Sequence, residues 1–125
     1  MSEQSNPKPV TAAYYYRVKW GFEKEWLELF LRNHWPILRE RWSAGDYTDV
    51  RLYTPRFHGD GRADWNVKVT ITYRDWATMD AHTPPALIER LYPDQERFLA
   101  EEQRRFALLD AHWDVPLEEH ELPKE

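Results

Sequence analysis

Apolar and polar positions alternate with the two-residue period of a β-strand in four stretches of the chain. We expect strands at residues 12–20, 47–57, 65–73 and 111–117. The third is the most regular, because every second position from Trp65 to Tyr73 is apolar or aromatic. Pro55 indicates that the second strand lies at a sheet edge, since proline has no N–H to donate to a neighbouring strand.

A helical spacing replaces this alternation between the first and second strands. Apolar residues recur every three or four positions across residues 23–43, which predicts a helix with one buried face. Pro36 lies inside this pattern and must kink or divide the helix, because it lacks an N–H and crowds the preceding turn. Gly45 is a typical residue at a helix end.

Three further features complete the pattern. Residues 58–62 are glycine-rich and predict a hairpin loop between the second and third strands. Asp75 has the side chain of a helix N-cap and predicts a short helix after the third strand. A last helix is expected at residues 93–109, where its opening proline is tolerated. Its charged residues, including an expected Glu101–Arg105 pair, are assigned to a solvated face.

The order is strand, helix, strand, strand, helices, strand. This is the split βαβ pattern of a ferredoxin-like α+β plait, in which a four-stranded antiparallel sheet carries helices on one face. We expect a disordered tail over residues 1–10, a single domain over residues 11–117 and an acidic tail over residues 118–125.

Each predicted strand has one side suited to the helix layer and one polar side. The sides assigned to the helices hold Tyr14, Tyr16, Val18 and Trp20; Val50 and Leu52; Val67, Val69 and Ile71; and Trp113, Val115 and Leu117. The opposite, open face is expected to hold Tyr15, Arg17 and Lys19; Asp49, Arg51 and Tyr53; Lys68, Thr70 and Thr72; and His112 and Asp114. Such a face is either solvated or covered by the same face of a second copy. Its tyrosines and threonines suit a half-dry enclosure and favour a homodimer.

Composition narrows the possible partners. The net charge is −5, and its 17 basic residues are interspersed among 22 acidic ones, so nucleic acid is not an expected partner. No apolar run reaches the about 18 residues that cross a bilayer, and no signal-peptide core is present, so we expect no membrane contact and a cytoplasmic location. Without cysteine or a His-x-His pattern, no metal and no cofactor are expected. The seven Trp, seven Tyr and five Phe suit a core and also a small organic ligand.

Two segments carry a resemblance to a known superfamily. They read YYYRVKWGFEKEWLELFLRNHWPILRERWSAG and YTDVRLYTPRF, and the first contains a His34-Trp35-Pro36 step similar to the His-x-Pro of EthD-like proteins. The chain resembles the dimeric α/β-barrel superfamily, which includes antibiotic-biosynthesis monooxygenase-like, stress-responsive and EthD-like proteins. The resemblance implies a homodimer with a cleft between sheet and helices or within the shared barrel. It also implies varied chemistry: cofactor-free oxygenases, decarboxylases, lactone isomerases, dehydratases, haem-degrading enzymes and proteins of unknown role.

His34 is the first candidate for general acid–base chemistry. Imidazole titrates near neutral pH, and Pro36 disturbs the helix beside it, which can turn the ring toward a cleft. The alternative is a histidine on the helix flank, bonded to a backbone carbonyl that Pro36 leaves without a partner.

His112 and Asp114 are the second candidate, since both are expected on the open face of the last strand. A carboxylate beside a histidine fixes its tautomer and favours proton abstraction from a weakly acidic carbon. Arg17 or Arg51 would hold an enolate or a carboxylate. The alternative is a lattice of cross-strand ion pairs at a dimer seam. Three further side chains on this face are expected to contact a ligand: Tyr15, Tyr53 and Thr70.

Three kinds of function stay open at this stage. The first is a small homodimeric, cofactor-independent enzyme that acts by proton transfer on a small aromatic or polyketide-like molecule, as a monooxygenase, isomerase or decarboxylase. The second is a non-catalytic dimer that binds a small ligand or serves as a scaffold. The third is a haem or metal protein, with His34 as the haem ligand by analogy with haem-degrading relatives.

Overall fold

A computed structural model describes residues 8–57 and 64–124, so the predicted hairpin loop at residues 58–62 lies outside the described residues. The strands are β1 (Val10–Val18), β2 (Tyr47–Tyr53), β3 (Val67–Tyr73) and β4 (Leu109–Leu117). The helices are α2 (Glu23–Asn33), α3 (Trp35–Ser43), α4 (Trp76–Asp80), α5 (Pro85–Leu91) and α6 (Gln95–Ala107).

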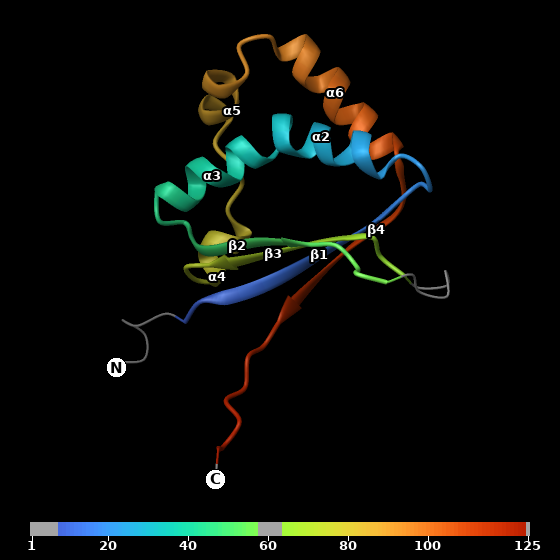
Figure 1. Ribbon diagram of the computed structural model, residues 1–125. Helices are drawn as coiled ribbons and strands as arrows, with labels where there is room; N and C mark the ends of the chain where they lie inside the picture. The colour runs from blue at the N-terminus through green and yellow to red at the C-terminus, as the bar shows by residue number, and fades with distance from the viewer. Residues whose placement is uncertain (1–7, 58–63, 125) are drawn as a thin grey trace.

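The strands form one antiparallel sheet in the order β2-β3-β1-β4. Helices α2 and α3 lie along one side of this sheet with α6 beyond them, and the short helix α4 lies at the end of the sheet beside β3 (Figure 1). This arrangement confirms the predicted ferredoxin-like α+β plait. The position of β2 at the edge agrees with the indication from Pro55, which follows that strand.

Pro36 divides the first predicted helix rather than kinking it. Helix α2 ends before His34, whose φ of −117° and ψ of −44° depart from helical geometry, and α3 begins immediately afterwards. Proline cannot donate to the carbonyl of Arg32 four residues earlier. The hydroxyl of Tyr92, in the segment that follows α5, donates to that carbonyl instead, at 3.1 Å. This hydrogen bond satisfies the backbone acceptor that Pro36 leaves without a partner.

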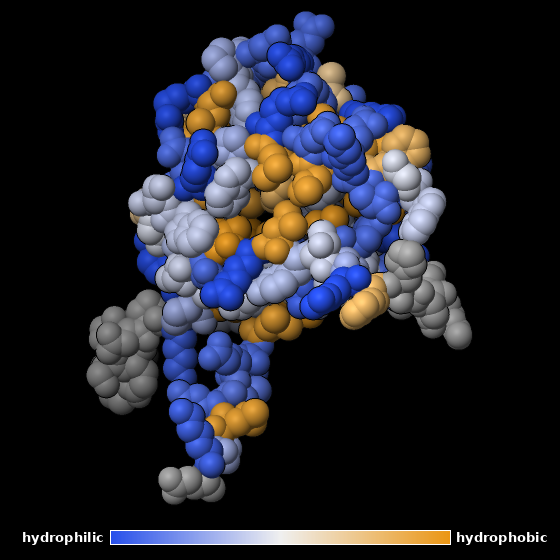
Figure 2. Space-filling view, in the orientation of Figure 1, coloured by the Kyte–Doolittle hydropathy of each residue, from blue (hydrophilic) through white to orange (hydrophobic). Residues whose placement is uncertain are grey.

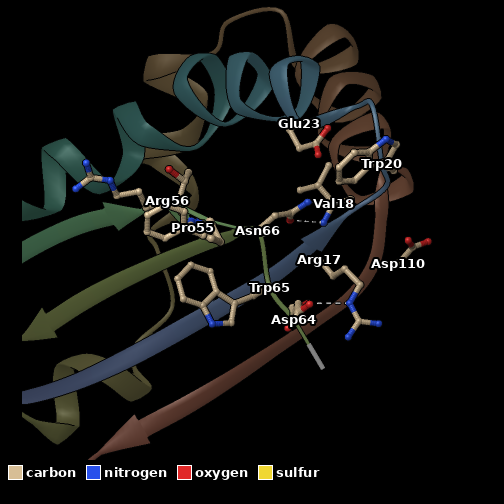
Figure 3. Close-up of a pocket in the computed structure, with 12 residues that line it drawn as sticks. Arg17, Val18, Trp20, Glu23, Pro55, Arg56, Asp64, Trp65, Asn66 and Asp110 are labelled. Carbon is tan, nitrogen blue, oxygen red and sulfur yellow. Dashed lines mark hydrogen bonds between the residues drawn. The ribbon is translucent and has the colours of Figure 1, made fainter. Parts of the chain in front are cut away.

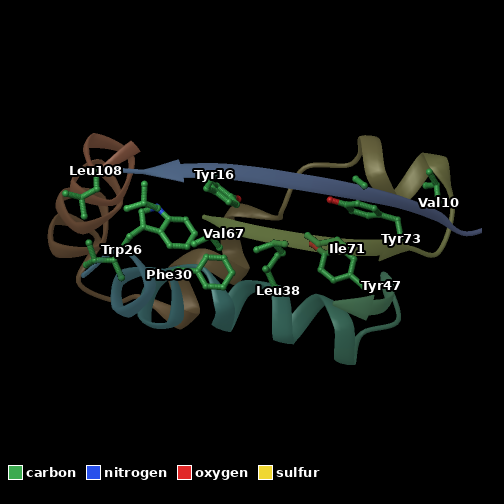
Figure 4. Close-up of a cluster of buried hydrophobic side chains, with 14 residues drawn as sticks. Val10, Tyr16, Trp26, Phe30, Leu38, Tyr47, Val67, Ile71, Tyr73 and Leu108 are labelled. Atoms are coloured by element: carbon green, nitrogen blue, oxygen red, sulfur yellow. The ribbon is translucent and has the colours of Figure 1, made fainter. Parts of the chain in front are cut away.

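Aromatic rings fill the core between the sheet and α2 (Figure 4). Trp26 is completely buried, with ring centroids 4.8 Å from Tyr16 on β1 and 5.4 Å from Phe30 one turn later on α2. Aliphatic residues of β3, including Val67 and Val69, complete this layer. Burying rings of this size contributes about 2–3 kcal/mol each, which fixes α2 against the strands.

The expected faces are correct for β1, β2 and β3 but wrong for β4. His112 pairs with Tyr16 and stacks on its ring at 4.4 Å, so it lies on the helix side of the sheet, as does Asp114 opposite Tyr14. Trp113 stacks on Tyr15 at 5.4 Å on the open face. Trp20, expected under the helices, lies beyond the end of β1 and is 81% exposed.

A β-bulge explains the exchanged faces of β4. Val18 pairs with Leu109 and Arg17 pairs with Ala111, so two steps along β4 correspond to one step along β1. The extra residue, Asp110, shifts the alternation of every residue after it by one position. Without this bulge, Trp113 would lie on the same side as Leu109, as the sequence pattern predicts.

Candidate functional site

His112 is held by its neighbours in one tautomer. Its Nδ1 lies 3.0 Å from the carbonyl oxygen of Tyr15, and a carbonyl only accepts, so Nδ1 carries the proton and donates. Its Nε2 lies 3.3 Å from a carboxylate oxygen of Asp114 and is the nitrogen that can exchange a proton. Both side chains remain partly accessible to solvent, so this pair lies at the edge of the molecule.

His34 lies at the break between α2 and α3 and faces the interior. Its ring is 5.3 Å from that of Phe30, and it makes no side-chain hydrogen bond to the residues described. Burial lowers the pKa of His34 to about 3, and the nearby guanidinium of Arg105 makes a smaller contribution. His34 is therefore a neutral imidazole at physiological pH. It lies in the helix layer beside Phe30, and His112 lies on the sheet face that this layer covers.

Arg105 joins this cluster and was missed by the sequence analysis, which placed it on a solvated face. It is only 2% exposed, and it pairs with Glu102 through Nε at 2.7 Å and Nη2 at 3.0 Å. The expected partner Glu101 instead binds Arg32 at 2.7 Å. The available signal was the i,i+3 spacing of Glu102 and Arg105 next to Phe106, whose ring lies 4.7 Å from the guanidinium carbon.

Three tyrosines add hydroxyl groups to the layer between sheet and helices. Burial raises the pKa of Tyr16 to about 12, although the nearby guanidinium of Arg105 opposes that rise. The hydroxyls of Tyr14 and Tyr73 share a hydrogen bond of 2.5 Å, and burial raises the pKa of both phenols. All three are thus protonated hydrogen-bonding groups at neutral pH. We refer to His34, Arg105, His112, Asp114 and Tyr16 as the sheet–helix site.

The surface beside the layer between sheet and helices is apolar on one side of the molecule. Figure 2 shows hydrophobic side chains gathered between the helix layer and the edge of the sheet, with a small hollow among them and hydrophilic residues around. An apolar, hollowed surface suits the approach of a flat organic molecule.

A second concave feature lies at the end of β1 (Figure 3). It is a pocket of about 520 Å³ whose lining includes Arg17, Trp20, Arg56, Trp65 and Asn66. Arg17 donates from Nε to the carbonyl oxygen of Asp64 at 2.8 Å. Of the predicted site residues only Arg17 lines this pocket, and neither histidine does.

The remaining predicted ligand contacts lie on the open face, with the sheet between them and the histidines. The ammonium of Lys68 lies 5.3 Å from the ring of Tyr15, 5.6 Å from Tyr53 and 5.9 Å from Trp65. Thr70 lies on the same face, and Arg51 pairs with Asp49 at 2.7 Å. These residues form an aromatic and charged surface, and they do not join the sheet–helix site.

Within residues 8–57 and 64–124, no group of three or more His, Asp or Glu side chains is arranged to hold a metal ion. No helix in the same residues has the length and apolar character needed to cross a membrane.

Comparison with solved structures gives the relationship of this fold to known proteins. A dimeric ferredoxin-like protein of unknown function from Thermobifida fusca is 11% identical, with 89% of this chain and 91% of that chain covered and a TM-score of 0.53. The fold is ferredoxin-like. A NIPSNAP family protein from Agrobacterium tumefaciens shares this ferredoxin-like fold at 17% identity, with 94% and 90% of the two chains covered and a TM-score of 0.54.

A variant of SnoaB, a cofactor-independent oxygenase from Streptomyces nogalater, has the same ferredoxin-like fold. It is 17% identical to this chain, with 94% of this chain and 99% of that chain covered and a TM-score of 0.52. No protein-family model and no curated protein matches the chain. At these identities the likeness shows the ferredoxin-like fold alone.

Proposed function

We propose that this protein is a homodimer that catalyses proton transfer on a small aromatic or polyketide-like molecule, without a metal or an organic cofactor. The observation that carries the proposal is the convergence of His34, His112 and Arg105 in the layer between sheet and helices. Arg105 comes from α6, His112 from β4 and His34 from the break between α2 and α3, and each of them contacts an aromatic ring of this layer.

Within this site His112 is the proton acceptor. Its Nδ1–H is fixed by the carbonyl of Tyr15, which leaves Nε2 beside Asp114 to take a proton from an activated carbon. Proton abstraction leaves the electron pair on that carbon, from which it delocalises to an adjacent oxygen as an enolate. Oxygenation, isomerisation and decarboxylation can all pass through such a carbanion, so this step is common to the three reaction types.

His34 has a different role. A group with a pKa of about 3 is a weak base at pH 7, so His34 is unsuited to proton abstraction. A neutral imidazole can instead donate a hydrogen bond to a substrate carbonyl and polarise it. We assign His34 this orienting role in place of the acid–base role expected from the sequence.

The open face supports the homodimer. The bulge in β4 turns Trp113, Val115 and Leu117 away from the helices, and Val115 and Leu117 remain 36% and 42% exposed. Apolar side chains gathered on a sheet face favour burial against another surface. Similar solved structures belong to dimeric proteins, which also supports the face of a second copy as the cover.

Exchange of carbon-bound hydrogen tests the proposed chemistry without knowledge of the natural substrate. The probe is 2-tetralone in D2O, whose benzylic C–H exchange is followed by NMR. We expect the protein to accelerate exchange and His112→Asn to lower that acceleration about a hundredfold, because asparagine keeps a donor for Tyr15 but lacks Nε2. His82→Asn, at an exposed position, is the matched control. Equal rates for all three proteins would refute the assignment of His112.

A second candidate function is non-catalytic ligand binding, and the pocket at the end of β1 favours it. That pocket has the volume of a small-molecule site and combines arginine with tryptophan, yet it contains neither histidine. An aromatic carboxylate such as 2-naphthoate should then shift the side-chain NMR signals of Trp65 and Arg56. Such shifts, in a protein that does not accelerate hydrogen exchange of 2-tetralone, would support this function.

A further inference from the structure

Residues 118–124 form a C-terminal arm that stands apart from the rest of the chain. The arm leaves the end of β4 and extends away from the sheet on the side opposite α2 and α3 (Figure 1). All of its residues are exposed, and none of their side chains makes a hydrogen bond or an ion pair with the other described residues. The arm thus points toward the side of the sheet that the proposed homodimer covers.

The arm carries negative charge that its own chain does not compensate. It contains Glu118, Glu119 and Glu121, and Lys124 is its one basic residue, so three carboxylates against one ammonium give a net charge of −2. A groove of about 1420 Å³ lies between the arm and the start of β1. Lys8 lines this groove, but among the described residues it forms no ion pair with the glutamates. The carboxylates of the arm are therefore available to another molecule.

The open face has the opposite requirement. Lys68 lies on the inner strand β3, and its ammonium is 5.3–5.9 Å from three aromatic rings. Within residues 8–57 and 64–124 it makes no ion pair and no hydrogen bond. The carboxylate of Asp49 on the same face already binds Arg51 at 2.7 Å. A second copy that covers this face would remove water from the Lys68 ammonium, and a buried charge without a partner is costly. The cover must therefore supply an anion.

We propose that the C-terminal arm of each copy crosses onto the open face of the other copy, where its glutamates pair with Lys68. The proposal rests on the homodimer of the proposed function and deepens it by naming the segment that completes the interface. Seven extended residues span about 23 Å and four strands are about 14 Å across, so the arm is long enough to cross a sheet. Leu122, which is 84% exposed, then gains the aromatic rings of that face as an apolar contact.

Charge reversal in two separate full-length variants tests which copy the arm contacts. The face variant is Lys68→Glu. The arm variant combines three changes: Glu118→Lys, Glu119→Lys and Glu121→Lys. Each variant alone places like charges against each other, so its self-association should weaken about ten- to a hundredfold. An equimolar mixture of the two has opposite charges at both contacts and should associate with about the wild-type affinity. Sedimentation velocity measures all three samples.

A matched control separates this effect from the change in net charge. Lys24→Glu makes the same reversal as the face variant at an exposed position of α2, on the helix side of the molecule. It should self-associate with the wild-type affinity.

Cross-linking of the wild-type protein tests the same contact without any variant. A carbodiimide joins an ammonium to a carboxylate only where the two are in contact. An equimolar mixture of ¹⁴N- and ¹⁵N-labelled protein distinguishes a contact between copies from a contact within one chain. We expect cross-linked peptides that join Lys68 to the arm and contain both isotopes.

Two results would overturn the proposal. Unchanged self-association of the arm variant would indicate that the anion beside Lys68 is a small molecule. Lys68–arm peptides that always contain a single isotope would show that the arm folds back on its own sheet. Either result leaves the homodimer of the proposed function intact. A monomeric wild-type protein would refute that homodimer together with the arm contact, and unchanged exchange of 2-tetralone in His112→Asn would refute only the proposed chemistry.

Discussion

Burial acts on individual side chains in this protein by holding them in their neutral forms. The imidazole of His34 and the phenols of Tyr14 and Tyr16 all have pKa values displaced away from ionisation near pH 7. Arg105 is the exception, since it keeps its charge by pairing with Glu102. The layer between sheet and helices thus contains polar atoms with little net charge.

His34 should make stability depend on pH. Its pKa is about 6.5 in the unfolded chain and about 3 in the folded one, so the unfolded chain binds more protons between these values. Stability is therefore fully present above pH 6.5 and is lost as pH falls toward 3. Between pH 7.5 and pH 5 we expect a loss of at most about 2 kcal/mol in wild type that is absent in His34→Gln. Urea unfolding at both pH values measures it, and equal losses in the two proteins would contradict the prediction.

The hydrogen bond between Tyr14 and Tyr73 should contribute measurably to stability. Tyr14→Phe removes one hydroxyl and leaves that of the buried Tyr73 without this partner, so the free energy of unfolding should fall by about 1 kcal/mol. The double variant Tyr14→Phe with Tyr73→Phe should lose less than the sum of the two single changes. Tyr15→Phe, on the open face, is the control. Additive losses would show that the two hydroxyls do not interact.

Secondary-structure elements show what the sequence could and could not predict. Strand β3 and the division at Pro36 were predictable because alternation and a missing N–H act locally. The bulge at Asp110 was not, because it depends on pairing with β1, and it reversed the faces assigned to His112 and Trp113. The sequence placed Arg105 on a solvated face for a related reason. Its burial comes from packing against Trp26, which lies 79 positions earlier in the chain.

Asn66 extends the pairing of β3 with β1 through its side chain. The N–H of Val18 donates to Oδ1 at 2.7 Å, and Nδ2 donates to the carbonyl of Val18 at 2.9 Å. Asn66→Ala should lower the free energy of unfolding by about 1–3 kcal/mol and speed amide exchange at Val18. Asn66→Asp keeps the acceptor and should preserve most protection at that amide. Unchanged exchange in Asn66→Ala would mean that another group bonds Val18.

For the whole molecule, the sheet separates two surfaces with different side chains. The helix side holds the sheet–helix site, and the open side holds rings around Lys68 together with the apolar residues of β4. The ferredoxin-like plait was predictable from element order, while the place of the histidines required the observed register. A homodimer would bury the open side and leave the sheet–helix site accessible.

Disruption of the open face should dissociate the proposed dimer. Val115→Arg places a charge among the apolar residues of that face, and we expect it to weaken self-association at least a hundredfold, because burying an unpaired charge is costly. Leu99→Arg, at an exposed position of α6, is the control for added charge. Sedimentation velocity over a range of concentrations measures both. A dimer of unchanged affinity in Val115→Arg would place the interface elsewhere.

The extra residue in β4 has a consequence for how this chain tolerates insertions and deletions. Removing Asp110 alone would leave Leu109, Ala111 and His112 in regular pairing with β1, so His112 would keep the helix side and Trp113 the open face. In a library of single-residue deletions, we therefore expect loss of Asp110 to preserve both self-association and 2-tetralone exchange. Deletions within residues 119–124 should leave 2-tetralone exchange unchanged. Insertion of one residue after Ala111, with the bulge retained, would instead turn His112 to the open face and Trp113 beneath the helices, and should abolish both activities.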